Sequence, residues 1–259
     1  TLLRLSPGEL EWFADARRLN HRSSNWSLRH YSEHWIRKSR GRYRLVEAPK
    51  PRLKAVQRRF LDALVSKIEP HEAAHGFVPG RSPLTHAEQH CSKKIVVTFD
   101  VEDFFCSIGA ARIHGLFRHL GYPREVRKLM TGLVTTITPR ETLEMLPQLR
   151  DGASITERES LEARLRSPHL PQGAPTSPAL SNLCMWRLDR RLAGLAAAMG
   201  GVAFSRYADD LTFSGSSTLA RRVDRFIPRV LSIIIEEGFR PNHRKTKIMR
   251  SHSRQIVTG

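Results

Sequence analysis

The stretch "RYADDLTFSG", residues 206–215, places two aspartates side by side between two short runs of β-prone residues. The wider pattern "VAFSRYADDLTFSG" (202–215) predicts a strand, a tight turn and a second strand. Neighbouring carboxylates repel each other, at a cost on the order of 4 kcal/mol for a separation of about 4 Å and an effective dielectric constant of about 20. Asp209 and Asp210 therefore either point apart into water, as in an ordinary exposed turn, or share a positively charged partner.

A third aspartate, Asp100, ends an apolar, β-branched run. The segment "KIVVTFDVEDFF" (94–105) predicts a buried strand, where a carboxylate is costly without compensation. If this strand pairs beside the 202–215 hairpin, the three aspartates converge at one edge of a sheet. Mg²⁺ takes such carboxylates together with water and substrate phosphates. Two ions about 3.5–4 Å apart stabilise the attacking and leaving oxygens of a phosphoryl displacement.

The charge balance indicates the class of partner. Lys and Arg number 43 against 25 Asp and Glu in 259 residues, a net charge of +18. A surplus of this size in a chain of ordinary globular composition favours a polyanion partner over a merely solvated basic surface. The basic residues are spread along the chain, through 37–44, 49–59 and 241–247, which suits a groove that follows a phosphate backbone. No basic amphipathic helix stands alone, so binding to a membrane surface is less favoured.

The cysteines and the apolar runs indicate the cellular compartment. Cys91, Cys106 and Cys184 lie far apart and form no zinc motif, which indicates reduced thiols. No apolar run approaches the roughly 20 residues that cross a bilayer, and no signal segment opens the chain. We therefore expect a cytoplasmic protein with no membrane partner.

Periodicity predicts an α+β fold in which helices pack on a small antiparallel sheet. The predicted helices cover 6–20 (with Ser6 as N-cap and Pro7 in the first turn), 53–68, 112–121, 124–137, 177–199 and 219–239, the last kinked or broken at Pro228. The predicted strands cover 43–51, 94–100, the 202–215 hairpin, 245–251 and 254–259. Residues 138–168 mix acids and arginines without a clear period, which predicts an insertion with one short helix.

Four ordered blocks resemble the reverse transcriptases. "RYADD" is similar to their Tyr-x-Asp-Asp box, and "FDVEDFF" resembles their first catalytic block. "LPQGAPTSPALSNL" resembles their nucleotide-binding loop and following helix, and "EEGFRPNHRKTKIM" their next block. Upstream, "LKAVQRRFLDAL" and "AHGFVPGRS" look like the fingers segments of bacterial enzymes. The resemblance covers nearly the whole chain from about residue 40.

The resemblance implies a right-hand polymerase architecture and a role for each matching position. It implies an N-terminal helical region (1–40), fingers (41–93), a palm (94–250, with the insertion) and the start of the junction to a thumb (251–259). The family's thumb follows this point, so we expect the chain to represent fingers and palm. The metal ligands would be Asp100, Val101, Asp209 and Asp210, of which the three aspartates are catalytic; the ions would be two Mg²⁺, with Mn²⁺ as a substitute.

The resemblance also implies the substrate contacts. Nucleotide-binding positions would be Arg42, Arg44, Lys54, Phe105, Gln172, Gly173 and Lys245. Primer and template positions would be Gly76, Arg81 and Tyr207. Phe105 would exclude a 2′-hydroxyl and so select deoxynucleotides, and Lys245 would donate a proton to the leaving pyrophosphate. The residues alone leave alternatives open: Phe105 as a core side chain, Tyr207 packed on the sheet, and Lys245 as a solvated lysine.

Two short motifs resemble the retron branch of the family. One is "VTG" (Val257, Thr258, Gly259); the other is "HAEQH" (86–90), in which Ala87 and His90 match an Asn-Ala-x-x-His box while His86 stands in place of Asn. These residues would recognise the cognate RNA. His86 and His90 without a third ligand indicate a helix surface rather than a metal site.

Retron enzymes copy part of a structured non-coding RNA, prime from one of its 2′-hydroxyls and leave a branched RNA–DNA product (msDNA). The implied partners are that RNA, the DNA product, dNTPs and an effector protein, and the implied role is anti-phage defence. Two alternatives stay open. One is a group II intron-like, CRISPR-associated or other defence reverse transcriptase, and the other is a non-catalytic nucleic-acid-binding scaffold.

Overall fold

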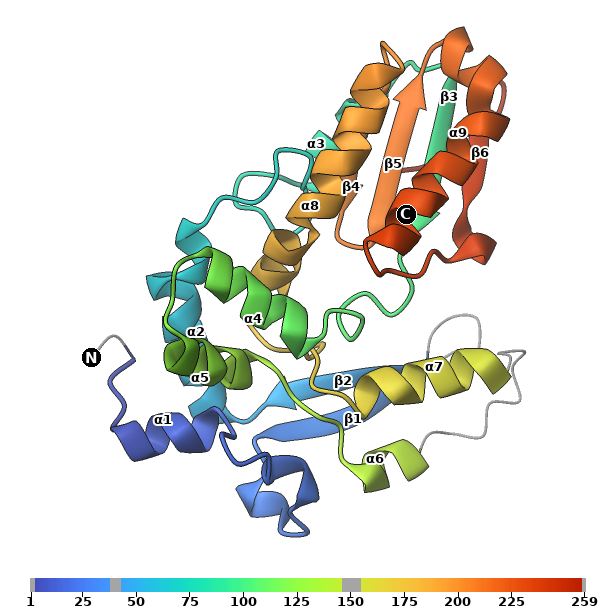
Figure 1. The fold of residues 1–259 in the computed structure, drawn as a ribbon. Coiled ribbons are helices and arrows are strands. Elements are labelled where there is room, and N and C mark those ends of the chain that lie inside the picture. Colours follow the sequence, from blue (N-terminus) through green and yellow to red (C-terminus); the bar gives the residue numbers. More distant parts are fainter. Residues whose placement is uncertain (1–2, 38–42, 146–154, 258–259) are drawn as a thin grey trace. The chain divides into compact units, whose positions relative to one another are not determined.

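The computed structural model describes residues 3–37, 43–145 and 155–257. The chain divides into two compact units, and Figure 1 shows their elements. Unit 1 consists of residues 1–68 and 105–181, and unit 2 of residues 69–104 and 182–259. Helix α8 (Ser177–Ala198) begins in unit 1 and continues in unit 2. Antiparallel sheets and helices together make the fold α+β, as the sequence predicts.

Unit 1 combines a β-hairpin with helices. Its elements are α1 (Pro7–Phe13), β1 (Tyr31–Arg37), β2 (Tyr43–Pro49), α2 (Pro51–Ala63), α4 (Ala110–His119), α5 (Arg124–Val134), α6 (Arg140–Glu144) and α7 (Ile155–Leu165). Strands β1 and β2 pair antiparallel, in a register that runs from Tyr31 opposite Pro49 to Arg37 opposite Tyr43. Helix α2 packs its apolar side inward, and Phe60 meets Phe117 of α4 edge to face at 6.0 Å.

The N-terminal segment partly departs from expectation. Ser6 caps α1 in a capping box with Glu9, and Pro7 occupies the first turn, as predicted. The helix ends at Phe13 rather than near residue 20, because Asp15 adopts a left-handed φ of 45° and its carboxylate accepts hydrogen bonds from the backbone N–H groups of Leu19 and Asn20. Strand β1 lies in a region that was expected to be helical, so that expectation was wrong for residues 31–37.

The stretch 138–168 contains more structure than predicted. Where one short helix was expected, the described residues form α6 and α7, while residues 146–154 lie outside the described part. Leu143 and Leu165 are buried against Leu45 of β2 in one apolar cluster. Burial of these few leucines explains the two helices, although the segment has no clear helical period.

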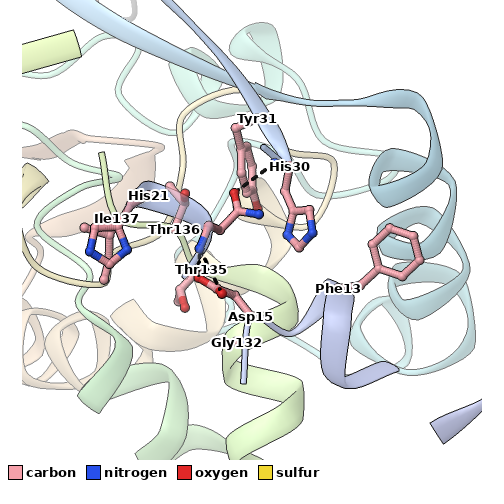
Figure 2. Close-up of a pocket in the computed structure, with 10 residues that line it drawn as sticks. Phe13, Asp15, His21, His30, Tyr31, Gly132, Thr135, Thr136 and Ile137 are labelled. Carbon is pink, nitrogen blue, oxygen red and sulfur yellow. Dashed lines mark hydrogen bonds between the residues drawn. The ribbon is translucent and has the colours of Figure 1, made fainter. Parts of the chain in front are cut away.

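A small cavity lies where α1 and the following loop meet α5. Figure 2 shows the rings of His21, His30 and Tyr31 around it, with Gly132 of α5 below. Its volume is about 10 Å³, enough for one water molecule and far too little for a nucleotide. Within unit 1 this cavity therefore does not represent a substrate site.

The described part of unit 2 is built on four antiparallel strands in the order β4–β5–β3–β6. The elements are α3 (Pro83–Glu88), β3 (Ile95–Asp100), β4 (Ala203–Tyr207), β5 (Asp210–Gly215), α9 (Ser217–Glu236) and β6 (Lys247–Arg250). Helices α8 and α9 cover one face of this sheet (Figure 1): Asp189 of α8 meets Arg206, and Phe226 of α9 packs on Phe213. The predicted pairing of the Asp100 strand with the 202–215 hairpin is confirmed.

Two details of unit 2 correct the sequence-based picture. Helix α9 continues through Pro228 rather than breaking there. Residues 254–257 form no strand in the described part of the chain; Gln255 instead donates hydrogen bonds to the carbonyl oxygens of Lys93 and Met249. The strand predicted around 245–251 is present as β6.

No helix in the described ranges combines the length and apolarity that crossing a membrane requires.

Candidate active site

Three aspartates gather where strand β3 ends and strand β5 begins. Asp100, the last residue of β3, lies directly opposite Asp210, the first residue of β5. Tyr207 and Asp210 pair across the turn between β4 and β5, so the turn consists of two residues, Ala208 and Asp209. Asp100 is 3% exposed, whereas Asp209 and Asp210 are half-buried. Opposite residues of paired strands point to the same face, so Asp100 and Asp210 share one side of the sheet.

Backbone contacts hold the aspartate turn in place. Ala208 adopts a left-handed φ of 56°, which a non-glycine residue tolerates only when its surroundings impose it. The backbone N–H of Val101 donates to the carbonyl oxygen of Asp209 at 3.0 Å, which joins the turn to the end of β3. Gly76 packs against the turn so closely that an added Cβ would stand 2.5 Å from the backbone nitrogen of Ala208. Gly76 therefore has no room for a side chain.

Asp100 is held by two polar side chains from the segment before β6. Asn242 donates from Nδ2 to Oδ1 of Asp100 at 2.9 Å, and Lys245 donates from Nζ to Oδ2 at 2.6 Å. Burial alone would lower the pKa of Lys245, but its hydrogen bond to Asp100 and the charges of the three aspartates raise that pKa above its usual value. The Lys245 ammonium is therefore fully charged at neutral pH.

The pKa of the Asp210 carboxyl group is raised by its surroundings in the cluster. Burial, followed by the charges of Asp209 and Asp100, raises the pKa of Asp210 to about 6. Lys245 and Lys247 oppose this shift without cancelling it. The site therefore keeps negative charge that its own basic residues do not neutralise, and an added cation would lower the energy of the ionised form.

The residues present fit a magnesium site completed by substrate. Among the residues that the structure describes, no three His, Cys, Asp or Glu side chains already enclose a metal position. Mg²⁺ does not need such a cage, because it commonly binds through one or two carboxylates together with water and substrate phosphates. Asp100, Asp209 and Asp210 offer carboxylate oxygens, whereas Val101 could contribute only a carbonyl oxygen because its side chain is a buried hydrocarbon.

A buried ion pair behind the turn was missed by sequence reasoning. Arg206 of β4 donates from Nε and Nη2 to the two carboxylate oxygens of Asp189, at 2.7 Å each, and both side chains are 0% exposed. From Nη1 it also donates to the carbonyl oxygen of Ala208 and to Oδ1 of Asn182, at 3.0 Å each. Asn182 in turn donates to the carbonyl oxygen of Gly76 at 2.8 Å. The only sequence signal was an arginine at an inward position of a predicted strand.

The family profile described as "Reverse transcriptase (RNA-dependent DNA polymerase)" matches residues 36–257, which is most of the chain. The chain belongs to the reverse transcriptase family. The paired aspartates of "RYADD", which resembles the family's Tyr-x-Asp-Asp box, lie at the β4–β5 turn, and Asp100 of "FDVEDFF" lies at the end of β3.

The curated relatives that match the chain are reverse transcriptases of retrons. The chain is 42% identical over 239 residues to the retron Mx65 reverse transcriptase of Myxococcus xanthus, covering 90% of this chain and 51% of the relative. It is 39% identical over 266 residues to the retron Mx162 reverse transcriptase of the same organism, covering 99% and 51%. It is 33% identical over 218 residues to the retron Ec86 reverse transcriptase of Escherichia coli, covering 84% and 58%.

These matches confirm the resemblance to bacterial retron-type reverse transcriptases that the motifs predicted. The chain spans about half the length of the curated relatives it matches.

The retron-like "HAEQH" box lies beside the hairpin formed by β4 and β5, and its two histidines are not on a helix surface. His86 and His90 are 0% and 2% exposed, so the surface interpretation was wrong. The two ring nitrogens of His90 bond to the hydroxyls of Ser205 on β4 and Ser214 on β5, at 2.7 Å each. The His86 ring lies 5.8 Å from that of Tyr207. Burial, and then nearby histidines, lowers the pKa of His86 to about 4 and that of His90 to about 3, so both rings are neutral at pH 7.

The other predicted positions of unit 2 lie as follows. Tyr207 is half-buried and ends β4, next to the aspartate turn. Arg81 donates through Nη1 to the carbonyl oxygens of Glu72 and Ala74, so it ties its own loop together. Ala87 and Val257 are half-buried. Thr258 and Gly259 lie outside the described residues.

The predicted nucleotide-binding residues, apart from Lys245, fall in unit 1. Arg44 on β2 and Lys54 on α2 are exposed, Phe105 and Gln172 are half-buried, and Gly173 is exposed. Arg42 lies outside the described residues. Their roles, and their placement against the aspartates of unit 2, stay predictions.

A buried pair supports the loop that carries Gln172 and Gly173. The backbone N–H of Glu47 donates to the carbonyl oxygen of Gln172 at 2.8 Å, and Gly173, with a φ of 130°, packs on the Glu47 carbonyl. The Glu47 carboxylate contacts His169 at 2.8 Å and accepts a hydrogen bond from Thr138 at 2.8 Å. Burial would lower the pKa of His169, but Glu47 raises it, which favours a charged pair.

Proposed function

We propose that this protein is an RNA-directed DNA polymerase of retron type, which copies a structured non-coding RNA into DNA. The observation that carries the proposal is the convergence of Asp100, Asp209 and Asp210 at the adjoining ends of β3 and β5. Membership of the reverse transcriptase family supports it. The net charge of +18 supports a nucleic-acid substrate.

Two Mg²⁺ ions, or Mn²⁺ in their place, would bind Asp100 and Asp209, with Asp210 and the Val101 carbonyl in support. Such ions supply charge stabilisation for the attacking and leaving oxygens of nucleotidyl transfer. The raised pKa of Asp210, near 6, is consistent with a site built for added positive charge. Asn242 would keep Asp100 oriented through its hydrogen bond to Oδ1.

Other residues would serve the substrate. Lys245, charged and bound to Asp100, would turn toward the leaving pyrophosphate and donate its proton there. Tyr207, next to the aspartate turn, would lie against the primer end. Gly76 and Arg81 would shape the adjoining template path. Because the Arg81 guanidinium is occupied by backbone carbonyls, its role would be to hold the loop.

In unit 1, Gln172 and Gly173 would line the nucleotide pocket, and Phe105 would select against a 2′-hydroxyl. Arg42, Arg44 and Lys54 would grip the triphosphate. In the proposed right-hand polymerase architecture, these residues would belong to the fingers and to the palm.

The retron-specific part of the proposal covers priming, product and biological role. The protein would start from a 2′-hydroxyl of its RNA, leave a branched msDNA and act with an effector protein in anti-phage defence in the bacterial cytoplasm. The similarity to retron Mx65 and Mx162 reverse transcriptases favours this over an intron-like or CRISPR-associated enzyme. His86, Ala87, His90, Val257, Thr258 and Gly259 would serve recognition of the RNA. For the buried histidines, that role would be indirect.

Primer extension tests the catalytic proposal. Full-length protein with Mg²⁺, a primed RNA template and dNTPs should extend the primer, and Asp209→Asn should abolish extension while RNA affinity is nearly unchanged. Asp224→Asn, an exposed position of α9, is the matched control and should extend normally. Normal synthesis by the Asp209 variant would refute the metal assignment. Absence of extension by the unmodified protein would favour a non-catalytic scaffold.

Sequencing the nucleic acid that co-purifies with the full-length protein tests the retron assignment. The expected product is a branched RNA–DNA hybrid encoded beside the gene. Recovery of bulk cellular RNA alone would contradict the retron assignment and leave the polymerase proposal standing.

A further inference from the structure

Helix α9 carries arginines on the side that faces away from the sheet. Its buried residues recur at helical spacing and orient the helix; they are Leu219, Val223, Phe226, Val230 and Ile234. Four exposed arginines occupy the outward side; they are Arg221, Arg222, Arg225 and Arg229. Helical geometry puts these four in an arc of about 100° and within about 12 Å along the axis. We call them the α9 arginine face.

These arginines lack the ion pairs that some exposed basic residues make on other helices. Lys128 of α5 pairs with Glu125, Arg140 of α6 with Glu144, and Arg166 with Glu162, each within one helical turn. Across the described ranges, none of the four side chains of the α9 arginine face makes an ion pair or a hydrogen bond. The helix offers them Asp224, but no ion pair forms with it. This face therefore presents closely spaced positive charge that no acidic side chain of the described residues pairs with.

The spacing also brings like charges together. Arg225 lies four residues from both Arg221 and Arg229, and like charges at that spacing destabilise a helix. All four residues are arginine, whose planar guanidinium binds phosphate through two hydrogen bonds, whereas a lysine acts only as a point charge. A partner with closely spaced phosphates would relieve the repulsion and use this geometry.

The α9 arginine face lies on the opposite side of the sheet from the aspartates. Phe226 of α9 packs on Phe213, which meets Phe99 of β3 at 5.9 Å. Asp100 follows Phe99 and so points to the other face, because successive side chains of a strand alternate. A nucleic acid bound to α9 is therefore not the primer end held at the aspartates.

We propose that the α9 arginine face binds the phosphate backbone of a segment of the RNA that is not being copied. This inference rests on the proposed polymerase function for the identity of the nucleic acid. The contact is independent of base sequence, since guanidinium groups on an exposed helix face read phosphates rather than bases. It adds affinity for a long RNA and leaves the chemistry at the aspartates unchanged.

A charge-matched pair of variants tests the inference in the full-length protein. Arg222→Gln/Arg225→Gln/Arg229→Gln removes three unpaired charges. The control, Lys128→Gln/Arg140→Gln/Arg166→Gln, removes three paired ones and leaves the same net charge. Affinity for a long structured RNA is measured against salt concentration, and extension is measured on a short primed template. Thermal unfolding checks that both variants fold, as exposed positions should allow.

The α9 variant should bind the long RNA more weakly than the control. The slope of log affinity against log salt should fall by about two, because each phosphate contact contributes roughly 0.7–0.9. Extension of the short template should match the unmodified protein. Equal RNA affinities and slopes for the two variants would overturn the inference and leave an acidic protein as the partner of this face. If the unmodified protein does not extend the primer at all, the polymerase proposal is refuted instead. The comparison of RNA binding by the two variants would still decide the inference about α9.

Discussion

Arg206 and Asp189 form a two-pronged ion pair with no exposed surface on either side chain, and this pair supports the turn that carries the aspartates. Two charges removed from water are costly unless their geometry is good and their remaining hydrogen bonds are satisfied. Here the third nitrogen of Arg206 is used by Ala208 and Asn182. The network therefore couples helix α8 to the strained residue beside Asp209.

Removing one partner should destabilise the protein strongly. Asp189→Asn leaves the guanidinium of Arg206 buried without its counter-charge, so the free energy of unfolding should fall by about 3–5 kcal/mol. An apolar double variant, Arg206→Met/Asp189→Leu, should recover most of that loss because no unpaired charge remains. Urea unfolding of the full-length protein measures both effects.

The same double variant separates stability from positioning. Without a donor to the Ala208 carbonyl, the aspartate turn should shift, and primer extension should fall on the order of a hundredfold, as expected for a displacement of about 1 Å at a reacting centre. A double variant that is stable and also extends at the unmodified rate would show that the turn holds its geometry without Arg206.

Gly76→Ala should impair catalysis through a direct backbone clash. The new Cβ would stand 2.5 Å from the nitrogen of Ala208 and 3.2 Å from the carbonyl carbon of Tyr207, and neither atom can move without shifting the aspartate turn. We expect a loss of about 1–3 kcal/mol in stability and a large loss of extension. Gly194→Ala in α8 is the control, because nothing lies within 4 Å of its added Cβ. Equal activity of the two variants would contradict the close approach at Gly76.

His90 should make the fold sensitive to acid. Its pKa is lowered to about 3 in the folded protein, first by burial and then by His86 and His75, against about 6.5 when unfolded. As pH falls below about 6.5, the unfolded state binds a proton that the folded state refuses, so stability falls by up to about 1.4 kcal/mol per pH unit.

The variant His90→Gln should show a shallower decline over the same pH range, measured as the urea midpoint from about pH 8 to about pH 5. The slope is the informative quantity, because the substitution also changes the bonds to Ser205 and Ser214 at every pH. Identical slopes for the two proteins would show that His90 does not titrate against folding.

Local patterns were sufficient for much of the fold and for the aspartates. Two short β-prone runs on either side of the aspartates predicted the 202–215 hairpin, and the β-branched run predicted the buried strand that ends at Asp100. Ser6 and Pro7 predicted the start of α1, because capping depends on residues within one turn. These features rest on interactions between near neighbours or on burial of a whole face, which a sequence displays directly.

Other features were not predictable because they depend on which side chain meets which. Asp189 lies 17 residues before Arg206 and reads as one more charge in a helix rich in arginine, yet it is completely buried. His86 and His90 read as surface positions of a short helix, yet both are buried, and the ring nitrogens of His90 bond to two hairpin hydroxyls. The helices α6 and α7 likewise depend on tertiary contacts, through the leucine cluster of unit 1. The end of α1 depends instead on a local turn, in which the Asp15 carboxylate accepts from the backbone of Leu19, and helical periodicity does not display such a turn.

By itself, the sequence determined which residues carry charge and which faces are apolar. That was enough to predict an α+β chain with a surplus of positive charge, and to predict that Asp100, Asp209 and Asp210 converge if their strands pair. The tertiary structure decided how those aspartates are held, through Arg206, Gly76 and the segment from Asn242 to Lys245. The physical reason is that burial follows the local apolar pattern, whereas a buried charge is stable only with a particular partner that packing brings from elsewhere in the chain.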